Sequence, residues 1–92
     1  MYSLNMNELE KILKALANKR RLAIVKYLKK EKEAKVGDIS SEIKLSFKAT
    51  SKHLGILYAV DIVEKEQRGL EMYYSLNSTS HPIIKHISNS FE

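Results

Sequence analysis

Our expectation for the architecture of this chain starts from the sequence Ser-Phe-Lys-Ala-Thr-Ser-Lys-His-Leu (SFKATSKHL) at residues 46–54. Its first residue, Ser46, is of a type that commonly caps the start of a helix, and apolar residues recur after it at helical spacing. The pattern predicts a helix from Phe47 to about Val60. Its expected inward side chains are Phe47, Leu54, Leu57 and Tyr58.

The predicted helix carries basic and hydroxyl side chains but no acidic one. Lys44, Lys48 and Lys52 recur every four residues, and no Asp or Glu occurs between Ile43 and Val60. The chain as a whole has a net charge of +5, which is weak evidence for a nucleic-acid partner, whereas charge concentrated on one segment is stronger evidence. An acid-free surface suits DNA, because each carboxylate facing the duplex would oppose the counterion release that drives binding.

The segments before this helix predict three more helices. Asn7 and Glu10 have the spacing of a capping box at the start of the first helix, and Asn18 is the expected cap of the second. A third, short helix is expected from about Val36 to Lys44.

After Asp61 the pattern changes from helix to strand. Residues 62–67 and 72–76 are rich in β-formers and flank a turn at residues 68–71, which predicts a hairpin. A last helix follows, with Pro82 in its first turn, where a missing N–H is harmless. The expected order is α-α-α-α-β-β-α, a mainly α fold with a β-hairpin wing in a single domain covering residues 1–92.

Two short helices followed by a hairpin describe a winged helix-turn-helix. In this arrangement the second helix enters the major groove of double-stranded DNA, and the hairpin reaches an adjacent phosphate strand or groove. His53 could equally pack beneath the DNA-facing surface, and Arg20 and Arg21 could contact phosphate or pair with an acid. The expected DNA-binding residues are Ser46, Lys48, Ala49, Thr50, Ser51, Lys52 and His53 on the helix and Lys65, Gln67 and Arg68 on the wing.

Three motifs together resemble the ArsR/SmtB family of small bacterial and archaeal repressors. They are Ala15-Leu-Ala-Asn-Lys-Arg-Arg-Leu-Ala-Ile24, Leu45-Ser46 with Ser51-Lys-His-Leu54 and Leu57, and Ile62-Val63 with Arg68-Gly69 and Tyr73-Tyr74-x-Leu76. The resemblance implies a homodimeric repressor that binds a palindromic operator through the helix beginning at Phe47. It also implies a dimer interface built from the first and last helices, and release of DNA when a metal or another signal binds.

Apolar stripes at the two ends of the chain agree with that interface. They exceed what four short helices need for one core, although a single larger monomer core is the alternative. The expected interface residues are Leu9, Ile12, Leu13, Leu16, Ile83, Ile84, Ile87 and Phe91.

The sequence departs from the family at its sensing sites. There is no cysteine, and Lys35 and Gly37 occupy the positions of the family's Cys-x-Cys pair, so we expect neither that metal site nor a cofactor. His81 and His86 are weak candidates for metal ligands, because a spacing of five does not place both on one helix face. Lys44 and Asp61 stand where the family usually turns with glycine. The inducer is left open.

Other classes of function find little support. The chain has no glycine-rich phosphate loop, no cysteine nucleophile and no His–carboxylate cluster at catalytic spacing, so we do not expect an enzyme. No apolar run approaches the roughly 20 residues that span a bilayer, and the N-terminus lacks the features of a signal peptide, so we expect a cytoplasmic protein. Two alternatives to the repressor are a winged-helix protein-interaction module without operator binding and a metal sensor based on histidine.

Overall fold

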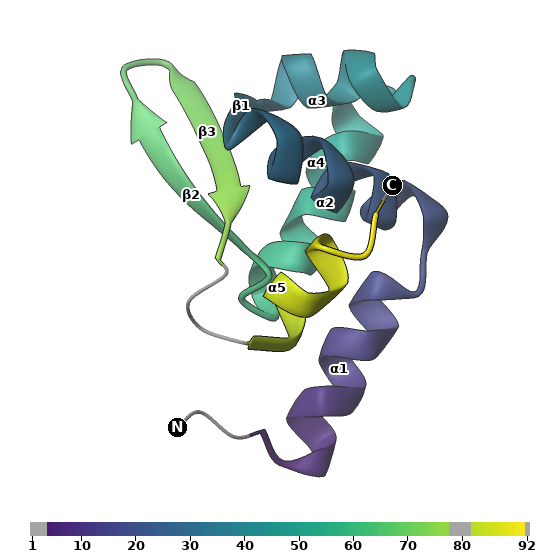
Figure 1. The fold of residues 1–92 in the computed structure, drawn as a ribbon. Helices are drawn as coiled ribbons and strands as arrows, with labels where there is room; N and C mark the ends of the chain where they lie inside the picture. Colours follow the sequence, from purple (N-terminus) through teal and green to yellow (C-terminus); the bar gives the residue numbers. More distant parts are fainter. Residues whose placement is uncertain (1–3, 78–81, 92) are drawn as a thin grey trace.

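The computed structural model describes residues 4–77 and 82–91, in which helices surround a small core and a long hairpin projects from one side (Figure 1). The elements are α1 (Met6–Leu16), α2 (Lys19–Glu31), β1 (Glu33–Lys35), α3 (Val36–Ile43), α4 (Phe47–Ala59), β2 (Val63–Arg68), β3 (Glu71–Leu76) and α5 (Pro82–Ser88). The expected four helices, hairpin and last helix are therefore confirmed. None of the described helices is both long and apolar enough to span a membrane.

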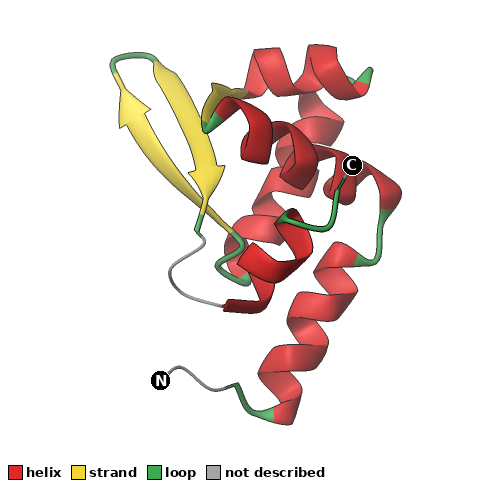
Figure 2. Ribbon diagram, in the orientation of Figure 1, coloured by secondary structure: helices red, strands yellow, loops and turns green. Residues whose placement is uncertain are grey.

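The three strands form one antiparallel sheet in the order β1-β3-β2 (Figure 2). Ala34 pairs with Tyr74 on one side of β3, and Lys65 pairs with the same residue on the other side. The strand β1 was not predicted, because a strand of three residues has no periodicity of its own and forms only where β3 offers a free edge.

The helix caps are local structures, and two of the three expected ones are confirmed. The side chain of Asn18 accepts from the amides of α2, and the hydroxyl of Ser46 accepts from the amide of Ala49 at 3.1 Å. The capping box of α1 uses Asn5 and Glu8 and not the expected Asn7 and Glu10. Both pairs have the same spacing, so the pattern could not distinguish them, and the true pair starts the helix earlier.

The turn between α3 and α4 forms although a lysine, and not a glycine, stands at its left-handed position. Lys44 adopts the left-handed conformation with φ 56° and ψ 50°, and the amide of Leu45 donates to the carbonyl of Ser40 at 3.0 Å. This closure satisfies a carbonyl at the end of α3. Asp61 likewise has a positive φ, 59°, just beyond α4.

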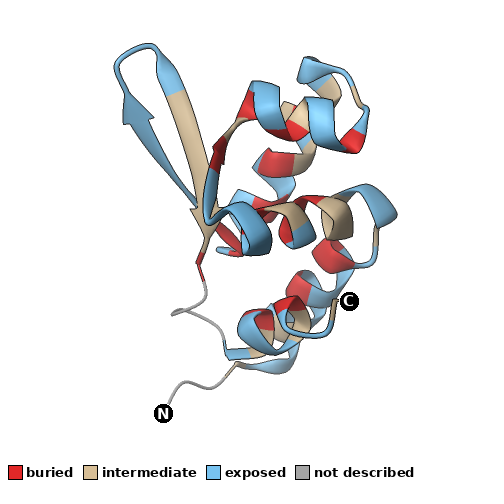
Figure 3. Cartoon of the chain, turned by 45° about the horizontal axis from the view of Figure 1, so that its top comes forward, coloured by how far each residue is buried: buried red, intermediate tan, exposed pale blue. Residues whose placement is uncertain are grey.

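The core is built from the buried faces of all five described helices and from the base of the wing (Figure 3). Leu54 and Leu57 of α4 are fully buried there, as expected. Two other expected inward residues are not: Phe47, in the first turn, is 61% exposed, and Tyr58 is 43% exposed. The ring of Tyr58 faces the wing, where the ammonium of Lys65 lies 4.2 Å from its centroid.

The apolar stripes of the terminal helices divide between the chain's own core and its surface. Ile12, Leu16 and Ile84 are buried within the protomer, which corrects their assignment to a dimer interface. Three further members of the expected interface, Ile83, Ile87 and Phe91, are half-buried against the same core. In α1, Leu9 is half-buried and Leu13 is 46% exposed.

Candidate nucleic-acid interface

The outward face of α4 presents the two lysines that the sequence singled out. Lys48 and Lys52 are exposed and lie one turn apart, on the side of the helix opposite to the buried Leu54 and Leu57. Within the part of the chain that the structure describes, neither lysine forms a hydrogen bond or an ion pair. Both ammonium groups are therefore available to an external anion.

The small residues at the start of α4 surround these lysines. Ser46 is exposed, and although its hydroxyl oxygen accepts from the amide of Ala49, the hydroxyl proton remains free to be donated. Ala49 and Ser51 are half-buried. The first two turns of α4 can thus approach a surface closely at these three positions.

Thr50 does not share this face, which corrects the expectation that it contacts DNA. Its side chain is 0% exposed, and its hydroxyl has no hydrogen-bond partner among the described residues. The physical reason is its spacing: Thr50, Leu54 and Leu57 stand at i, i+4 and i+7 and point together into the core. The lysines at 48 and 52 lie on the other side.

His53 packs beneath the basic face and is held by Arg21. The ring nitrogen Nδ1 lies 3.2 Å from Nη1 of Arg21, and it must accept, because a guanidinium has only donors. Burial lowers the pKa of His53, and the positive charges of Arg21, Arg20 and Lys52 lower it further. His53 is thus packed against Arg21, and its lowered pKa leaves the imidazole neutral at neutral pH; its contact with DNA stays a prediction.

Arg20 and Arg21 donate to backbone carbonyls, a third kind of acceptor beside the phosphate and the acid that the sequence suggested. Arg20 donates to the carbonyl of Ile43 at 2.7 Å, at the end of α3. Arg21 donates through Nε to the carbonyl of Ala15, near the end of α1. The last carbonyls of a helix lack partners within the helix, and arginine supplies donors to them. These two side chains fix α1, α3 and α4 around the start of α2.

Arg68 of the wing is engaged within the protein. Its guanidinium bridges the carboxylates of Glu33 on β1 and Glu66 on β2, with Nη2 3.0 Å from Oε1 of Glu33. Its Cζ also lies 4.4 Å from the centroid of the Tyr73 ring. The hydrogen bonds from Arg68 lower the pKa of the Glu33 carboxyl. The predicted phosphate contact of Arg68 would have to compete with two carboxylates, so the structure argues against it.

The other two wing residues differ in what they can offer. The side-chain amide of Gln67 donates to the carbonyl of Gly69 at 2.9 Å and supports the turn of the hairpin. Lys65 is exposed, and its ammonium lies over Tyr58 at the end of α4. Lys65 is therefore the wing cation best placed to continue the basic face of α4.

The histidine candidates for a metal site are not brought together with other ligands. His86 is exposed on α5, and His81 lies outside the described residues. Across residues 4–77 and 82–91, no three His, Cys, Asp or Glu side chains are grouped as a metal ion would require.

Comparison with known proteins agrees with this geometry. The profile of the family described as "Bacterial regulatory protein, arsR family" matches residues 18–65. The chain is 37% identical over 83 residues to the transcriptional activator HlyU of Vibrio cholerae, covering 83% of this chain and 76% of the relative. It is 32% identical over 68 residues to the transcriptional repressor SdpR of Bacillus subtilis, covering 74% of each chain.

A solved structure supports the same likeness. The solution structure of a homodimeric winged helix-turn-helix DNA-binding domain from Mycobacterium bovis superposes with a TM-score of 0.81 at 25% identity, covering 91% of this chain and 78% of that one.

Proposed function

The chain belongs to the ArsR family of bacterial regulatory proteins and is a DNA-binding transcription regulator, and from this premise we propose that it acts as a homodimeric repressor on a twofold-symmetric operator. The observation that carries the proposal is the outward face of α4, where Lys48 and Lys52 stand exposed and unpaired among the described residues. Ser46, Ala49, Ser51 and Lys65 complete the proposed contact surface.

An apolar face on α1 supports dimer formation. Met6 is 82% exposed, and together with Leu9, Leu13 and Ala17 it lines a shallow apolar groove along the helix. Burying these side chains against a second copy would remove apolar surface from water, which is the main favourable term in subunit association. The relative from Mycobacterium bovis is described as a homodimer.

The repressor role is inferred from where a bound dimer would lie on the DNA. A dimer whose recognition helices occupy two successive major grooves, about 34 Å apart, covers DNA that another protein would need. Of the two relatives, SdpR is named a repressor and HlyU an activator, so both signs of regulation occur among proteins similar to this chain.

Selection of bound DNA from a random pool tests operator binding. We expect an enriched inverted repeat whose half-sites are centred about 10 base pairs apart, because two symmetric α4 helices would then lie on one face of the duplex. Recovery of DNA without a shared sequence, or of a single half-site, would contradict the symmetric operator. Absence of DNA binding altogether would favour the protein-interaction module.

Sedimentation equilibrium of two leucine variants tests the dimer. Leu13→Glu places a charge on the proposed interface and should shift the dimer toward monomer. Leu70→Glu is the matched control, because Leu70 is fully exposed in the turn that joins β2 to β3. That turn lies at the far end of the hairpin from α1 (Figure 1). The dimer proposal would be wrong if Leu13→Glu sedimented like the unmodified chain, or if both variants dissociated equally.

A further inference from the structure

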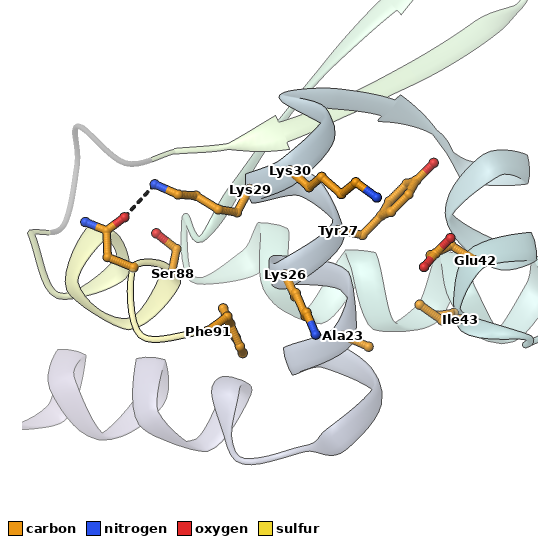
Figure 4. Close-up of a pocket in the computed structure, with 10 residues that line it drawn as sticks. Ala23, Lys26, Tyr27, Lys29, Lys30, Glu42, Ile43, Ser88 and Phe91 are labelled. Atoms are coloured by element: carbon orange, nitrogen blue, oxygen red, sulfur yellow. Dashed lines mark hydrogen bonds between the residues drawn. The ribbon is translucent and has the colours of Figure 1, made fainter.

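A groove of about 660 Å³ lies between α2, the end of α3 and the residues around the end of α5 (Figure 4). This volume is within the range of roughly 300–1,000 Å³ that is usual for small-molecule sites. Neither Lys48 nor Lys52 lines it, so the groove is separate from the basic face of α4. It is equally separate from the groove along α1 that we assign to the dimer.

One wall of the groove is positively charged. Lys26 and Lys30 stand one turn apart on α2, and neither is hydrogen-bonded or ion-paired within the described residues. Lys29 reaches instead toward the end of α5, where its ammonium donates to the side-chain oxygen of Asn89 (Figure 4). Glu42 of α3 is the one carboxylate among the described lining residues, so the cations exceed it.

The rest of the lining is largely apolar. Phe91, beyond α5, and the ring of Tyr27 on α2 are both half-buried and pack against the core. Ala23 and Ile43 add aliphatic surface between them. An occupant can therefore remove an apolar body from water while its charged end stays beside the lysines.

We propose that this groove binds a small organic anion, with its acidic group at Lys26 and Lys30 and its aromatic or aliphatic body against Phe91 and Tyr27. Charge-assisted hydrogen bonds from two ammonium groups would hold the acidic end. A neutral apolar molecule would leave those charges unmatched, and a bare inorganic anion would leave the apolar surface in water. Both parts of the ligand are therefore needed for tight binding.

Calorimetric titration without DNA tests the site with three probes. The probes are 4-phenylbutyrate, its uncharged counterpart 4-phenylbutan-1-ol, and inorganic phosphate. We expect one phenylbutyrate per chain, and binding of each of the other two weaker by about tenfold or more. If the alcohol or phosphate bound as tightly as phenylbutyrate, the amphipathic character of the site would be refuted.

Paired lysine variants locate the binding. Lys26→Gln/Lys30→Gln should weaken phenylbutyrate binding by about tenfold or more, and Phe91→Ala should weaken it independently of charge. Lys48→Gln/Lys52→Gln removes the same charge from α4 and should leave the affinity unchanged. Equal losses in both lysine pairs would mean attraction by net charge alone, and no loss in the first pair would place the probe elsewhere. Either result overturns the proposal, and neither bears on operator binding.

Discussion

Replacing Lys48 and Lys52 by glutamine should flatten the salt dependence of operator binding while leaving the fold intact. Both side chains are exposed and have no partner among the described residues, so the free energy of unfolding should change by no more than about 0.5 kcal/mol. Glutamine keeps the length and helix propensity of the side chain and removes only the charge. A change in DNA affinity can then be assigned to the interface itself.

The magnitude follows from counterion release. If each lysine neutralises one phosphate, a dimer makes four such contacts, and each contributes about 0.9 to the slope of log K against log salt. The slope of the double variant should therefore be shallower than that of the unmodified protein by about 3.6. Between about 50 and 200 mM salt, the unmodified protein should lose affinity about 150-fold more than the variant does.

Fluorescence anisotropy of a labelled operator, titrated at several salt concentrations, measures both slopes. Lys26→Gln/Lys30→Gln is the matched control, because it lowers the net charge equally from a different surface, and its slope should stay within about 1 of the unmodified value. The proposed role of α4 is refuted if the slope of Lys48→Gln/Lys52→Gln is unchanged. It is also refuted if both pairs lose the same amount.

Three further predictions concern the supporting structure. Lys44→Gly should raise the free energy of unfolding by about 0.5–1 kcal/mol, because glycine adopts the left-handed conformation without steric strain. Urea denaturation at a fixed protein concentration measures this, and no gain would show that the turn holds lysine without strain. Arg20→Met should lower the free energy of unfolding by about 1.5 kcal/mol, since the carbonyl of Ile43 loses its charged donor. An unchanged urea midpoint would show that water replaces that hydrogen bond. Because the pKa of His53 is lowered in the native chain, the unfolded chain takes up a proton at a higher pH than the native chain does. The free energy of unfolding should therefore fall as the pH drops through 6.5 and level off below the native pKa. His53→Gln removes the titrating group while keeping an acceptor for Arg21. Between about pH 7.5 and 5 this variant should lose less unfolding free energy than the unmodified chain, and equal losses would show that His53 does not titrate in this way.

The elements that the sequence predicted well are those whose signals lie within a few residues. Asn18 and Ser46 cap α2 and α4 as expected, because a cap is a contact between a side chain and an amide two or three residues away. The buried face of α4 at Leu54 and Leu57 follows from helical periodicity. At the start of α1 the pairs Asn5/Glu8 and Asn7/Glu10 have the same spacing, so the local pattern was ambiguous and the predicted capping box was wrong.

The same periodicity could have placed Thr50 correctly. It stands four residues before Leu54 and seven before Leu57, which puts it on the buried face. Its hydroxyl suggested a polar environment, but a threonine methyl group packs readily, and the position on the helix outweighs the side-chain type. Phe47 is the converse case, an apolar residue of the first turn that remains exposed beyond the edge of the core.

The order of the helices, the hairpin and the acid-free basic face of α4 could be predicted because each depends on neighbouring residues, and the lack of thiolate ligands follows from the composition. The partners of the arginines and the histidine depend instead on contacts between distant parts of the chain. Arg20 meets a carbonyl 23 residues away, Arg21 meets His53 across 32 residues, and Arg68 meets Glu33 across 35. An arginine can donate to a carbonyl, a carboxylate or a phosphate, and its partner depends on which group the fold brings within reach.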